Sequence, residues 1–543
     1  MSDQLIASQN EDEYKLAISK LQRKLEEIYQ GGGKKKIEKL HQEGKLHARE
    51  RIQLLIDKGT EFLEIGALAA LDMYAEEGGC PAAGVVCGLG KIHGRICMVV
   101  ANDASVKAGA WFPMTGKKNL RAQEIAMENY IPIIYLVDSA GVFLPMQDEI
   151  FPDKEHFGRI FRNNAKMSSM GIPQIAAVMG ACVAGGAYLP IMSDEALIVE
   201  NTGSIFLAGP YLVKAAIGEN VDKETLGGAD TTTEISGIID HKMPDDTSCL
   251  ERIRELVKGL GHKPKAGFDR IPSIEPASPA SKIFELIPFQ SNKPFPIIPV
   301  LQCIVDKDSM IPYKEEYGKT IFCTYARIDG WSVGILANNR EVIRAGKGEM
   351  QFGGVIYSDS ADKATRFILN CNQKHIPLIF LQDVTGFMVG TRSEQGGIIK
   401  DGAKMVNAVA NSTVPKFTII IGNSYGAGNY AMCGKAYDPR LIVAWPSAKI
   451  AVMGGHQAAK VLTDLQIHKL KSKGHEPNPE EEKELYKKIK DQYEEQESPY
   501  YAAARLWVDG IINPLDTRNF IATGIEMASH APVEKFNVGV IQV

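Results

Sequence analysis

The sequence lacks the features that mark several large classes of protein. No stretch approaches the roughly 20 consecutive apolar residues that a membrane-spanning helix needs. The N-terminal stretch MSDQLIASQNEDEYKLAISKL has neither the apolar centre of a signal peptide nor the arginines of a transit peptide. With a net charge of -5, the chain also lacks the basic excess of a nucleic-acid binder. These absences predict a cytoplasmic protein that binds neither membrane nor nucleic acid.

Patterns of metal ligands and disulfides are missing as well. The nine cysteines form no CxxC pair, and they extend from Cys80 to Cys433 without the spacing of a zinc ribbon or a disulfide framework. No spacing of His, Cys and carboxylate residues indicates a metal site. We therefore expect reduced, mostly buried thiols and no metal in this chain.

What the chain does contain is an internal repeat. A length of 543 residues is too great for one hydrophobic core, and five segments recur along it in the same order. The pairs, each with its first residue, are KIHGRICMVVAND (Lys91) and RIDGWSVGILANN (Arg327), IPIIYLVDSAG (Ile131) and IPLIFLQDVTG (Ile376), IPQIAAVMGACVAGGAY (Ile172) and VPKFTIIIGNSYGAGNY (Val414), DEALIV (Asp194) and DPRLIV (Asp438), and SGIIDH (Ser236) and DGIINP (Asp509). The sequence therefore predicts two copies of one fold.

Within each copy, runs of Val, Ile and Leu alternate with helical stretches such as KKNLRAQEIAMEN and GGIIKDGAKMVNAVANS. Strands without polar alternation are buried on both faces, which is typical of an α/β fold. The segment 264–299 is rich in proline and has no clean periodicity, so it predicts a linker. The expected organisation is a helical lead (1–33), an N-terminal domain (34–263), this linker and a C-terminal domain (300–543). The charged stretch KLKSKGHEPNPEEEKELYKKIKDQYEEQE predicts an exposed helical excursion with a proline-marked turn.

Both copies place small residues where a buried strand should give way to a helix. Gly185 lies 12 residues after Pro173, and Ala427 lies 12 residues after Pro415. A helix start at each place would offer unpaired N–H groups to an oxygen that becomes negative during a reaction. A second N–H could come from the loop after the preceding strand, DSAGV in one copy and VTGFM in the other. The alternative is that these glycines only allow tight packing of strand and helix.

Residues that would act as a base or a nucleophile are not evident beside these loops. Ser424 has no adjacent histidine, and His456 fits a packed or solvent-facing histidine better than a base. Asp138 and Asp383 fall at strand ends, where we expect them to make turn hydrogen bonds. A catalyst with two oxyanion holes and no base of its own requires a base from a cofactor.

Several long segments resemble one family. The segments are GKLHARERI, NDASVKAGAWFPMTGKKNLRAQEIA, FPDKEHFGRIF, IFLAGPYLVKAAIGE, FLQDVTGFMVG and YYAAARLWVDGII. They are similar to the carboxyltransferase (β) subunits of biotin-dependent acyl-CoA carboxylases, most closely the methylcrotonyl-CoA carboxylase type. The resemblance extends from about Lys34 to the C-terminus. It implies two tandem crotonase-like (ClpP/crotonase) domains, one for each copy of the repeat.

The resemblance implies transfer of CO2 from carboxybiotin to the coenzyme A thioester of an acyl group, in the first instance 3-methylcrotonyl-CoA. Biotin that has lost its CO2 would act as the base. It would be carried by a separate biotin carboxylase/biotin carrier (α) subunit, since this sequence shows neither an MKM-type biotinylation site nor a glycine-rich ATP-grasp segment. The family also implies a homo-oligomer, a hexamer of β subunits. Its sites lie between the N-terminal half of one subunit and the C-terminal half of another.

Matching the motifs residue by residue implies two sets of site residues. The implied oxyanion donors are Gly185 and Gly186 for the acyl-CoA and Ala427 and Gly428 for biotin. The other residues expected to bind acyl-CoA are Ala140, Gly141, Val142, Phe143, Ala184, Tyr188, Gly209 and Lys214. The other residues expected to bind biotin are Gly386, Phe387, Met388, Tyr425, Gly426, Gly454 and Gly455. Lys214 is either a partner for a CoA phosphate or only a surface lysine.

Two departures from the methylcrotonyl pattern leave the acyl group open. In DSAGVFLPMQ, Phe143 and Met146 replace a polar and a charged residue, which predicts a more apolar acyl site. The chain is also longer than that type after Asn339, through GKGEMQFGGVIYSD. The alternatives are a propionyl-CoA, geranyl-CoA or longer-chain acyl-CoA carboxylase subunit, the carboxyltransferase of a glutaconyl-CoA-type decarboxylase, and a non-catalytic scaffold for biotin subunits.

Overall fold

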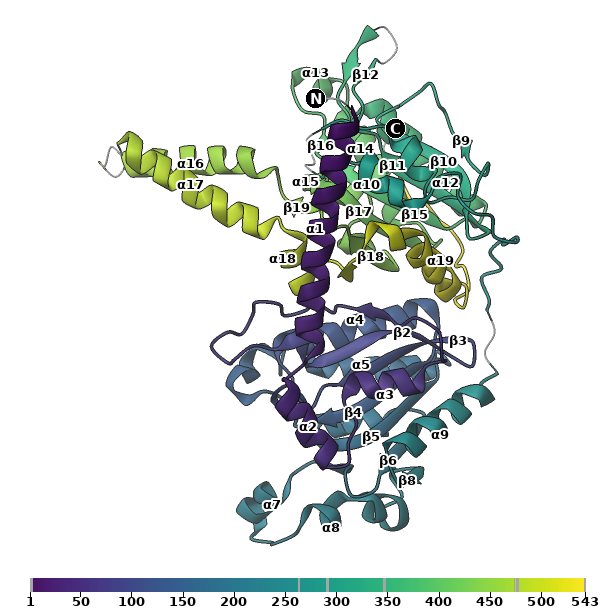
Figure 1. Cartoon of the computed structure of the whole chain (residues 1–543), viewed down its shortest axis with the longest axis vertical. Helices are drawn as coiled ribbons and strands as arrows, with labels where there is room; N and C mark the ends of the chain where they lie inside the picture. Colours follow the sequence, from purple (N-terminus) through teal and green to yellow (C-terminus); the bar gives the residue numbers. More distant parts are fainter. Residues whose placement is uncertain are drawn as a thin grey trace. The chain divides into compact units, whose positions relative to one another are not determined.

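The computed structural model describes residues 3–261, 264–289, 293–344, 348–472, 474 and 478–541. Its contacts divide the chain into two compact units, which Figure 1 shows coloured along the sequence. The N-terminal unit comprises residues 23–264 and 504–506. The C-terminal unit comprises the chain up to Gln22, residues 265–503 and the chain from Trp507 onward.

The division lies close to the expected domain boundary but does not isolate the lead or the linker. The expected boundary at residue 263 lies outside the described residues, next to the division at 264/265. Another division, between residues 22 and 23, falls inside the first helix, α1 (Asp3–Tyr29). In the expected linker, α10 (Ile283–Leu286) buries Ile283 and Phe284. Lead and linker are therefore parts of the two units in this structure.

An eight-stranded sheet forms the centre of the N-terminal unit. Its order is β1-β2-β3-β4-β5-β6-β8, with β7 paired to β5, and the strands from β3 to β6 run parallel. The strands are β1 (Leu63–Ile65), β2 (Val85–Ile92), β3 (Arg95–Asn102), β4 (Ile133–Ser139), β5 (Gln174–Val183), β6 (Glu195–Val199), β7 (Ser204–Phe206) and β8 (His241–Met243). The helices after α1 are α2 (Lys34–Gln42), α3 (Ala48–Leu55), α4 (Pro113–Asn129), α5 (Phe157–Ser169), α6 (Tyr188–Ile191), α7 (Pro210–Ile217), α8 (Lys223–Gly227) and α9 (Asp246–Gly259).

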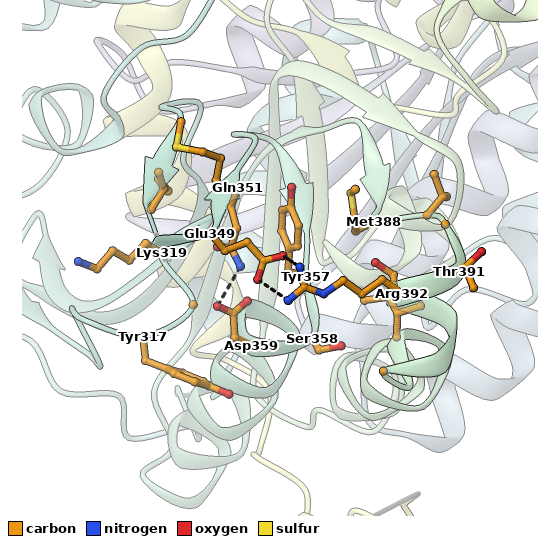
Figure 2. Close-up of a pocket in the computed structure, with 18 of the residues that line it drawn as sticks. Tyr317, Lys319, Glu349, Gln351, Tyr357, Ser358, Asp359, Met388, Thr391 and Arg392 are labelled. Carbon is orange, nitrogen blue, oxygen red and sulfur yellow. Dashed lines mark hydrogen bonds and ion pairs between the residues drawn. The ribbon is translucent and has the colours of Figure 1, made fainter. Parts of the chain in front are cut away.

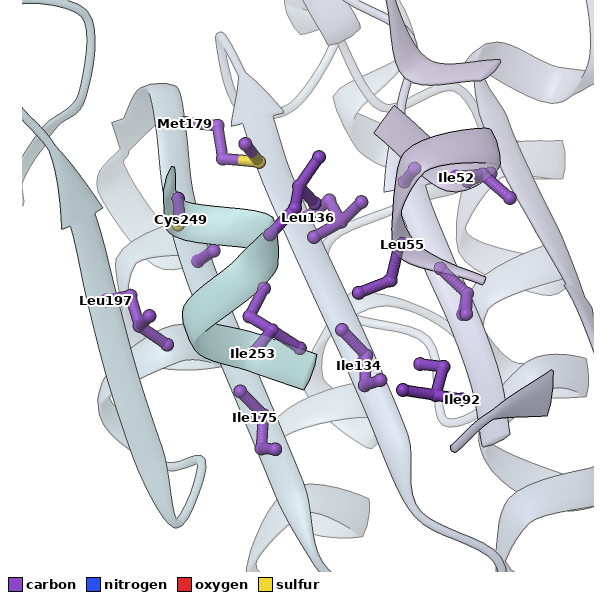
Figure 3. Close-up of a cluster of buried hydrophobic side chains, with 14 of the residues drawn as sticks. Ile52, Leu55, Ile92, Ile134, Leu136, Ile175, Met179, Leu197, Cys249 and Ile253 are labelled. Atoms are coloured by element: carbon purple, nitrogen blue, oxygen red, sulfur yellow. The ribbon is translucent and has the colours of Figure 1, made fainter. Parts of the chain in front are cut away.

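Helices α3 and α9 cover one face of this sheet with apolar side chains (Figure 3). Ile52 and Leu55 of α3 and Ile253 of α9 belong to one buried cluster with Ile134 and Leu136 of β4. Each fully buried Leu or Ile side chain contributes about 1.5–3 kcal/mol relative to exposure to water. This core gives the strands rigid positions, so the loops at their ends start from defined points.

The C-terminal unit is built on a second eight-stranded sheet. Its order is β20-β18-β17-β15-β11-β10-β9, with β19 paired to β17. The strands of this sheet are β9 (Ile311–Pro312), β10 (Ile321–Ile328), β11 (Trp331–Asn338), β15 (Leu378–Val384), β17 (Lys416–Tyr425), β18 (Leu441–Ala444), β19 (Lys449–Ala451) and β20 (Gly510–Ile511). Two further pairs of strands form two-stranded sheets, β12 (Ile343–Arg344) with β13 (Met350–Gln351) and β14 (Val355–Ile356) with β16 (Gly386–Phe387). The helices after α10 are α11 (Ile297–Leu301), α12 (Ser358–Gln373), α13 (Thr391–Gln395), α14 (Ile398–Ala410), α15 (Gly426–Ala431), α16 (Gly455–Ser472), α17 (Pro479–Gln496), α18 (Pro499–Ala504) and α19 (Thr517–Ala528).

The two sheets have the same construction, which confirms the repeat and the predicted α/β fold. Read from β9, the second sheet follows the first strand by strand, and β19 pairs beside β17 as β7 pairs beside β5. Both helical stretches predicted from the sequence are helices, α4 and α14. The loops that follow β4 and β5 therefore correspond to those that follow β15 and β17.

The charged stretch near the C-terminus forms a hairpin of α16 and α17, which Figure 1 shows extending from the rest of its own unit. The side chain of Asn478 caps α17, accepting hydrogen bonds from the N–H groups of Glu480 and Glu481, and Pro479 occupies the first turn. Residues 473 and 475–477, in the predicted turn, lie outside the described residues. In the described part of the chain, no helix combines the length and hydropathy that crossing a membrane requires.

Candidate active site

The turn after β5 in one sheet and the turn after β17 in the other begin with a similar backbone conformation. Val183 and Tyr425 are extended, and the next residues, Ala184 and Gly426, have φ angles of 56° and 53°. This left-handed region suits glycine but costs a residue with a side chain of the order of 1–3 kcal/mol. The N-terminal unit thus keeps a strained alanine where the C-terminal unit has a glycine, and such strain is typical of functional turns.

A short helical segment starts at each of these turns, as the sequence predicts. A 3-10 turn over Ala184–Ala187 leads into α6, and α15 begins at Gly426. The first N–H groups of such a segment have no acceptor inside it. Gly186 has open space where a Cβ would lie, and Ala427 is exposed. The backbone at both turns is therefore open to a molecule outside the chain.

The loop after β4 offers fewer N–H groups than the sequence suggests. Ala140 N donates to Ala108 O at 2.9 Å, and Phe143 N donates to Trp111 O at 2.9 Å. Gly141 N donates to Ser139 Oγ at 3.1 Å. In the part of the chain that the structure describes, the N–H of Val142 has no such acceptor. The second N–H donor expected on the acyl-CoA side is therefore the backbone N–H of Val142.

The loop after β15 is tied to a neighbouring strand. Gly386 and Phe387 form β16, which pairs in parallel with β14. Thr385 N donates to Gly354 O at 2.8 Å, and Met388 N donates to Ile356 O at 2.9 Å. The expected biotin-side loop is therefore held in place by the segment that the sequence identifies as additional.

The glycines of the two turns have different neighbours. A Cβ on Gly185 would lie 2.8 Å from Cε1 of Phe157, whereas a Cβ on Gly428 would lie 2.6 Å from Cγ2 of Val384. Val384 ends β15, so Gly428 allows α15 to pack closely on that strand. The packing interpretation therefore describes Gly428 well, but it does not account for Gly186.

Aromatic rings lie on one side of the turn after β5, next to Gly185. The ring centroids of Trp111 and Phe157 are 5.0 Å apart, and those of Phe157 and Phe161 are 5.1 Å apart. The ring centroids of Phe161 and the half-exposed Tyr188 are 6.0 Å apart. Gly185 is thus next to a continuous aromatic wall, which suits an apolar group beside a polar backbone.

The two residues that depart from the methylcrotonyl pattern pack inward. The ring of Phe143 stacks on that of Phe112 with centroids 4.2 Å apart. Phe143 and Met146 both pack against a buried cluster that includes Ala69, Cys80 and Phe112. Packing in this cluster accounts for both side chains, so they do not argue for an altered acyl group.

Helix α7, which carries Lys214, has no buried residue although most of its side chains are apolar. Tyr211 is 93% exposed and Ile217 is 72% exposed. Gly209 caps the start of this helix in an extended conformation. Lys214 is exposed, which is compatible with either interpretation of it.

A cavity of about 540 Å³ opens beside the second turn, in the C-terminal unit. Gly426 is part of its wall, together with polar atoms of Ser424 and Asn429. Most of the lining is apolar or aromatic, and the residues that contribute it are Ile420, Tyr430, Ala436, Ile442, Ile450, Ala451, Val452, Tyr493 and Trp507. Such a lining with a few polar groups is typical of a small-molecule site.

A buried carboxylate lies in the wall of this cavity. Glu497 is 3% exposed, its Oε1 is 2.6 Å from Lys449 Nζ, and its Oε2 accepts a hydrogen bond of 3.3 Å from the Tyr425 hydroxyl. Burial, and then the charge of Glu497, raise the pKa of Tyr425 far above its usual value. Gly454 lies against the Tyr425 ring and Gly455 against the Glu497 carboxylate. Tyr425, Gly426, Gly454 and Gly455 are thus brought together, whereas the sequence gives no sign of Glu497.

A second cavity of the C-terminal unit, about 660 Å³, is shown in Figure 2. Met388 lines it from the loop after β15. The additional segment forms the opposite side of the cavity. Glu349 of this segment forms an ion pair of 2.7 Å with Arg392 of α13, and Gln351 donates a hydrogen bond of 3.2 Å to Asp359. Residues 345–347, at the start of that segment, lie outside the described residues. Both pairs join residues of the cavity wall to one another.

The other candidate acid–base residues make hydrogen bonds or ion pairs within the chain. Ser424 Oγ accepts a hydrogen bond of 2.7 Å from Asn429 Nδ2, and His456 Nδ1 is 2.8 Å from the Tyr486 hydroxyl on the hairpin. The expectation that Asp138 and Asp383 serve turns is wrong, because both carboxylates are buried and ion-paired. The sequence did hold a signal for them, since both recur at the same place in the repeat.

The nine cysteines are all buried and none is in a disulfide, which confirms the prediction that the thiols are buried. Burial raises the pKa of Cys80 and of Cys87 to about 12. In the described ranges, no three or more His, Cys, Asp or Glu side chains form a group that could hold a metal ion.

Three comparisons with known proteins span both units. The carboxyl transferase domain family matches residues 39–538. The biotin-dependent 3-methylcrotonyl-coenzyme A carboxylase beta1 subunit of Mycobacterium tuberculosis is 47% identical over 99% of each chain. The mitochondrial methylcrotonoyl-CoA carboxylase beta chain of Dictyostelium discoideum is 49% identical over 95% of this chain and 85% of its own. The crystal structure of the beta subunit of P. aeruginosa geranyl-CoA carboxylase matches with a TM-score of 0.86 and 34% identity, over 99% of this chain and 98% of that chain.

Proposed function

The chain belongs to the carboxyl transferase domain family and is the carboxyltransferase (β) subunit of a biotin-dependent acyl-CoA carboxylase; we propose that its acyl substrate is 3-methylcrotonyl-CoA. The predicted family and crotonase-like fold are thereby confirmed. The geometric observation that carries the proposed mechanism is the turn that recurs in both units, with φ angles of 56° at Ala184 and 53° at Gly426. Two such turns suit a reaction in which negative charge develops on two different oxygens.

On the acyl-CoA side, the N–H groups of Gly185 and Gly186 would stabilise the thioester oxygen as the acyl group loses a proton. Val142 supplies a further N–H in the neighbouring loop. Backbone donors of this kind are held by the fold before the substrate arrives, and losing one typically costs about 3 kcal/mol of transition-state stabilisation. The aromatic wall formed by Trp111, Phe157 and Phe161 would exclude water from the acyl group.

The choice of 3-methylcrotonyl-CoA is supported by sequence and by packing. Both curated relatives described above carry methylcrotonyl in their names and are 47% and 49% identical, whereas the geranyl-CoA carboxylase subunit is 34% identical. Phe143 and Met146 pack on a core cluster, so the motif departures do not require a longer acyl chain.

On the biotin side, the residues present fit the bicyclic ring of biotin, which is apolar apart from its ureido group. The cavity beside Gly426 is mainly apolar, and Ser424 and Asn429 add polar atoms. Carboxybiotin would supply the CO2 and, once decarboxylated, the nitrogen that takes the proton. Ala427 and Gly428 would offer N–H groups to the ureido oxygen, while Tyr425 and Glu497 hold the wall of the cavity. No protein base is then needed.

We also propose that biotin arrives on a separate biotin-carrying subunit and that copies of this chain assemble, with a hexamer as the expected form. Tyr211 and Ile217 of α7 are exposed apolar side chains on a helix that buries none of its residues. A surface of this kind supports coverage by another chain. Sedimentation of the purified chain measures the size of the assembly, and a stable monomer would contradict it.

The test of the proposed function is turnover of chemically carboxylated biotin by the purified chain with 3-methylcrotonyl-, propionyl-, geranyl- and glutaconyl-CoA. We expect the highest kcat/KM for 3-methylcrotonyl-CoA, with the carboxylated thioester identified by mass spectrometry. A higher kcat/KM for another thioester would overturn the acyl assignment. Absence of turnover with all four, from folded protein supplied with a biotin-carrying subunit, would contradict the proposed mechanism.

A further inference from the structure

One buried carboxylate lies at the same place in each unit, and the mechanism above does not use it. Asp138 is near the end of β4 and Asp383 is near the end of β15, and the two residues are 3% and 2% exposed. Each directly precedes a loop with expected site residues, 139–143 in one unit and 384–388 in the other. We call these the first site loops, and we call 184–187 and 426–429 the second site loops.

Each carboxylate also contacts the strand that leads into the second site loop. A Cβ on Gly180 would overlap the carboxylate of Asp138, and a Cβ on Gly422 would overlap that of Asp383. Gly180 lies five residues before Gly185, and Gly422 lies five residues before Ala427. A glycine on β5 and on β17 therefore makes room for the aspartate of the adjacent strand, and the carboxylate links the two loops of its unit.

Hydrogen bonds hold both aspartates in this position. Asp138 N donates to Asn102 Oδ1 at 3.3 Å, and Asp383 N donates to Asn338 Oδ1 at 3.0 Å. In the C-terminal unit the link to the second loop is direct, since Asn423 N donates to Asp383 Oδ1 at 2.8 Å. The asparagines recur because they belong to the matched strands β3 and β11.

The cations that compensate the two charges come from unrelated places. Asp138 lies 3.4 Å from Arg51 Nη1 and 3.3 Å from Lys45 Nζ, and the same arginine donates to Asp246 at 2.7 Å and to Met179 O at 3.2 Å. Asp383 lies 3.4 Å from Arg340 Nε. Burial raises the pKa of Asp383, while Arg340 and the N–H of Asn423 oppose that shift.

We propose that Asp138 and Asp383 are positioning residues, each of which fixes the two site loops of its own unit relative to one another. A carboxylate that served only as an ion-pair partner would keep its cation, whereas here the cation changes and the contact with glycine recurs. The inference rests on the proposed function, because it assigns Asp138 to the acyl-CoA side and Asp383 to the biotin side. A displacement of about 1 Å at a reacting group is enough to lower the rate about 100-fold.

The test compares D138A and D383A in the full chain, with carboxylated biotin and 3-methylcrotonyl-CoA varied separately. We expect kcat to fall about 100-fold in both variants. KM for the thioester should rise only in D138A, and KM for carboxylated biotin should rise only in D383A. D138N and D383N should recover part of the loss, because asparagine keeps the volume and one acceptor oxygen. Equal changes of both KM values in the two variants would overturn the inference.

Hydrogen exchange provides a readout that does not depend on turnover. We expect faster exchange in both site loops of the N-terminal unit in D138A and of the C-terminal unit in D383A. The control is D306A, since Asp306 is equally buried, lies 2.7 Å from Arg518 and contacts neither site loop. If D306A reproduces the same loop exchange, the effect is one of stability and the inference is wrong. If the wild-type protein shows no turnover while the two variants show this exchange pattern, the proposed function is refuted and the positioning role remains supported.

Discussion

In the N-terminal unit, the turn after β5 lies beside aromatic rings, whereas in the C-terminal unit the equivalent turn after β17 borders a cavity. Phe157 contacts the position of a Cβ on Gly185, and Gly426 lines the cavity of about 540 Å³. The backbone of the two turns is nevertheless the same, with positive φ at Ala184 and Gly426. The two copies therefore share the positive φ at the start of the turn, whereas the side chains around it differ.

Under the proposed function, the side chains around the turns are what would let one turn serve two substrates. Between β19 and β20 the C-terminal unit has the α16–α17 hairpin and Glu497, where the N-terminal unit has α7 and α8 between β7 and β8, and the C-terminal unit also has the additional segment before α12. The N-terminal unit instead has an exposed apolar helix, α7. Under the proposed function, the backbone of the two turns would set the reaction, and the elements added around each turn would set the choice of substrate.

The strongest test of this comparison is a side chain at Gly185. In G185V, the added atoms meet the ring of Phe157 and displace the turn, so we expect turnover to fall about 100-fold or more. KM for the thioester should rise, whereas KM for carboxylated biotin should not change. Steady-state kinetics measure both, and G158A is the control because Gly158 has open space. A fully active G185V would contradict the oxyanion interpretation of this turn.

The shared aspartate–glycine contacts predict equal effects in the two units. In G180A and in G422A, the new methyl group overlaps a buried carboxylate, so we expect each change to lower the free energy of unfolding by about 1–3 kcal/mol. Calorimetry of the two variants measures the loss. G510A is the matched control, because Gly510 lies on a strand with no atom near the added Cβ. Destabilisation of one unit alone would show that the contact is not equivalent in both.

Glu497 is a feature of the C-terminal unit alone, and a substitution there tests its role. E497Q removes the buried charge that pairs with Lys449, and we expect a loss of about 1–3 kcal/mol in stability together with a higher KM for carboxylated biotin. KM for the thioester should not change. E494Q is the control on the same helix, since Glu494 and Lys490 form a solvent-exposed pair that contributes little. An unchanged KM for carboxylated biotin would remove Glu497 from the biotin side.

The smallest effect is expected at a pair of matched thiols. Cys87 and Cys323 are buried on β2 and β10, and burial raises the pKa of each to about 12. At pH 8 both remain protonated thiols, so iodoacetamide should neither label them nor reduce turnover. Mass spectrometry after labelling in increasing urea then reports which unit opens first. Rapid labelling of either thiol in native protein would contradict its burial.

Much of the fold could be predicted because it follows from local patterns. Apolar runs without polar alternation predict buried parallel strands, and the helices α4 and α14 follow from their own sequence. Each of these patterns occurs in both copies of the repeat, which strengthened the predictions and located both turns. The expected helix starts at Ala184 and Gly426 are present, although the helical segments are short.

The site was less predictable, because its contacts join distant parts of the chain. Whether Phe143 enters the acyl site or stacks on Phe112 depends on tertiary packing and not on its motif. The sequence predicted more free N–H donors in the loop after β4 than the structure has, since the N–H groups of Ala140, Gly141 and Phe143 donate hydrogen bonds within the chain. No local pattern states which N–H groups the fold has already used.

Two α/β units with matching turns follow from the amino-acid sequence alone, because strand burial and glycine placement are properties of short segments. Which charges are buried together depends on the three-dimensional fold and not on any local pattern. Arg51 reaches Asp138 across 87 residues and Tyr425 reaches Glu497 across 72, and such pairs form only where the sheet order brings their strands and helices together. A buried charge is stable only with a partner, so the fold selects these pairs once the backbone has set the distance.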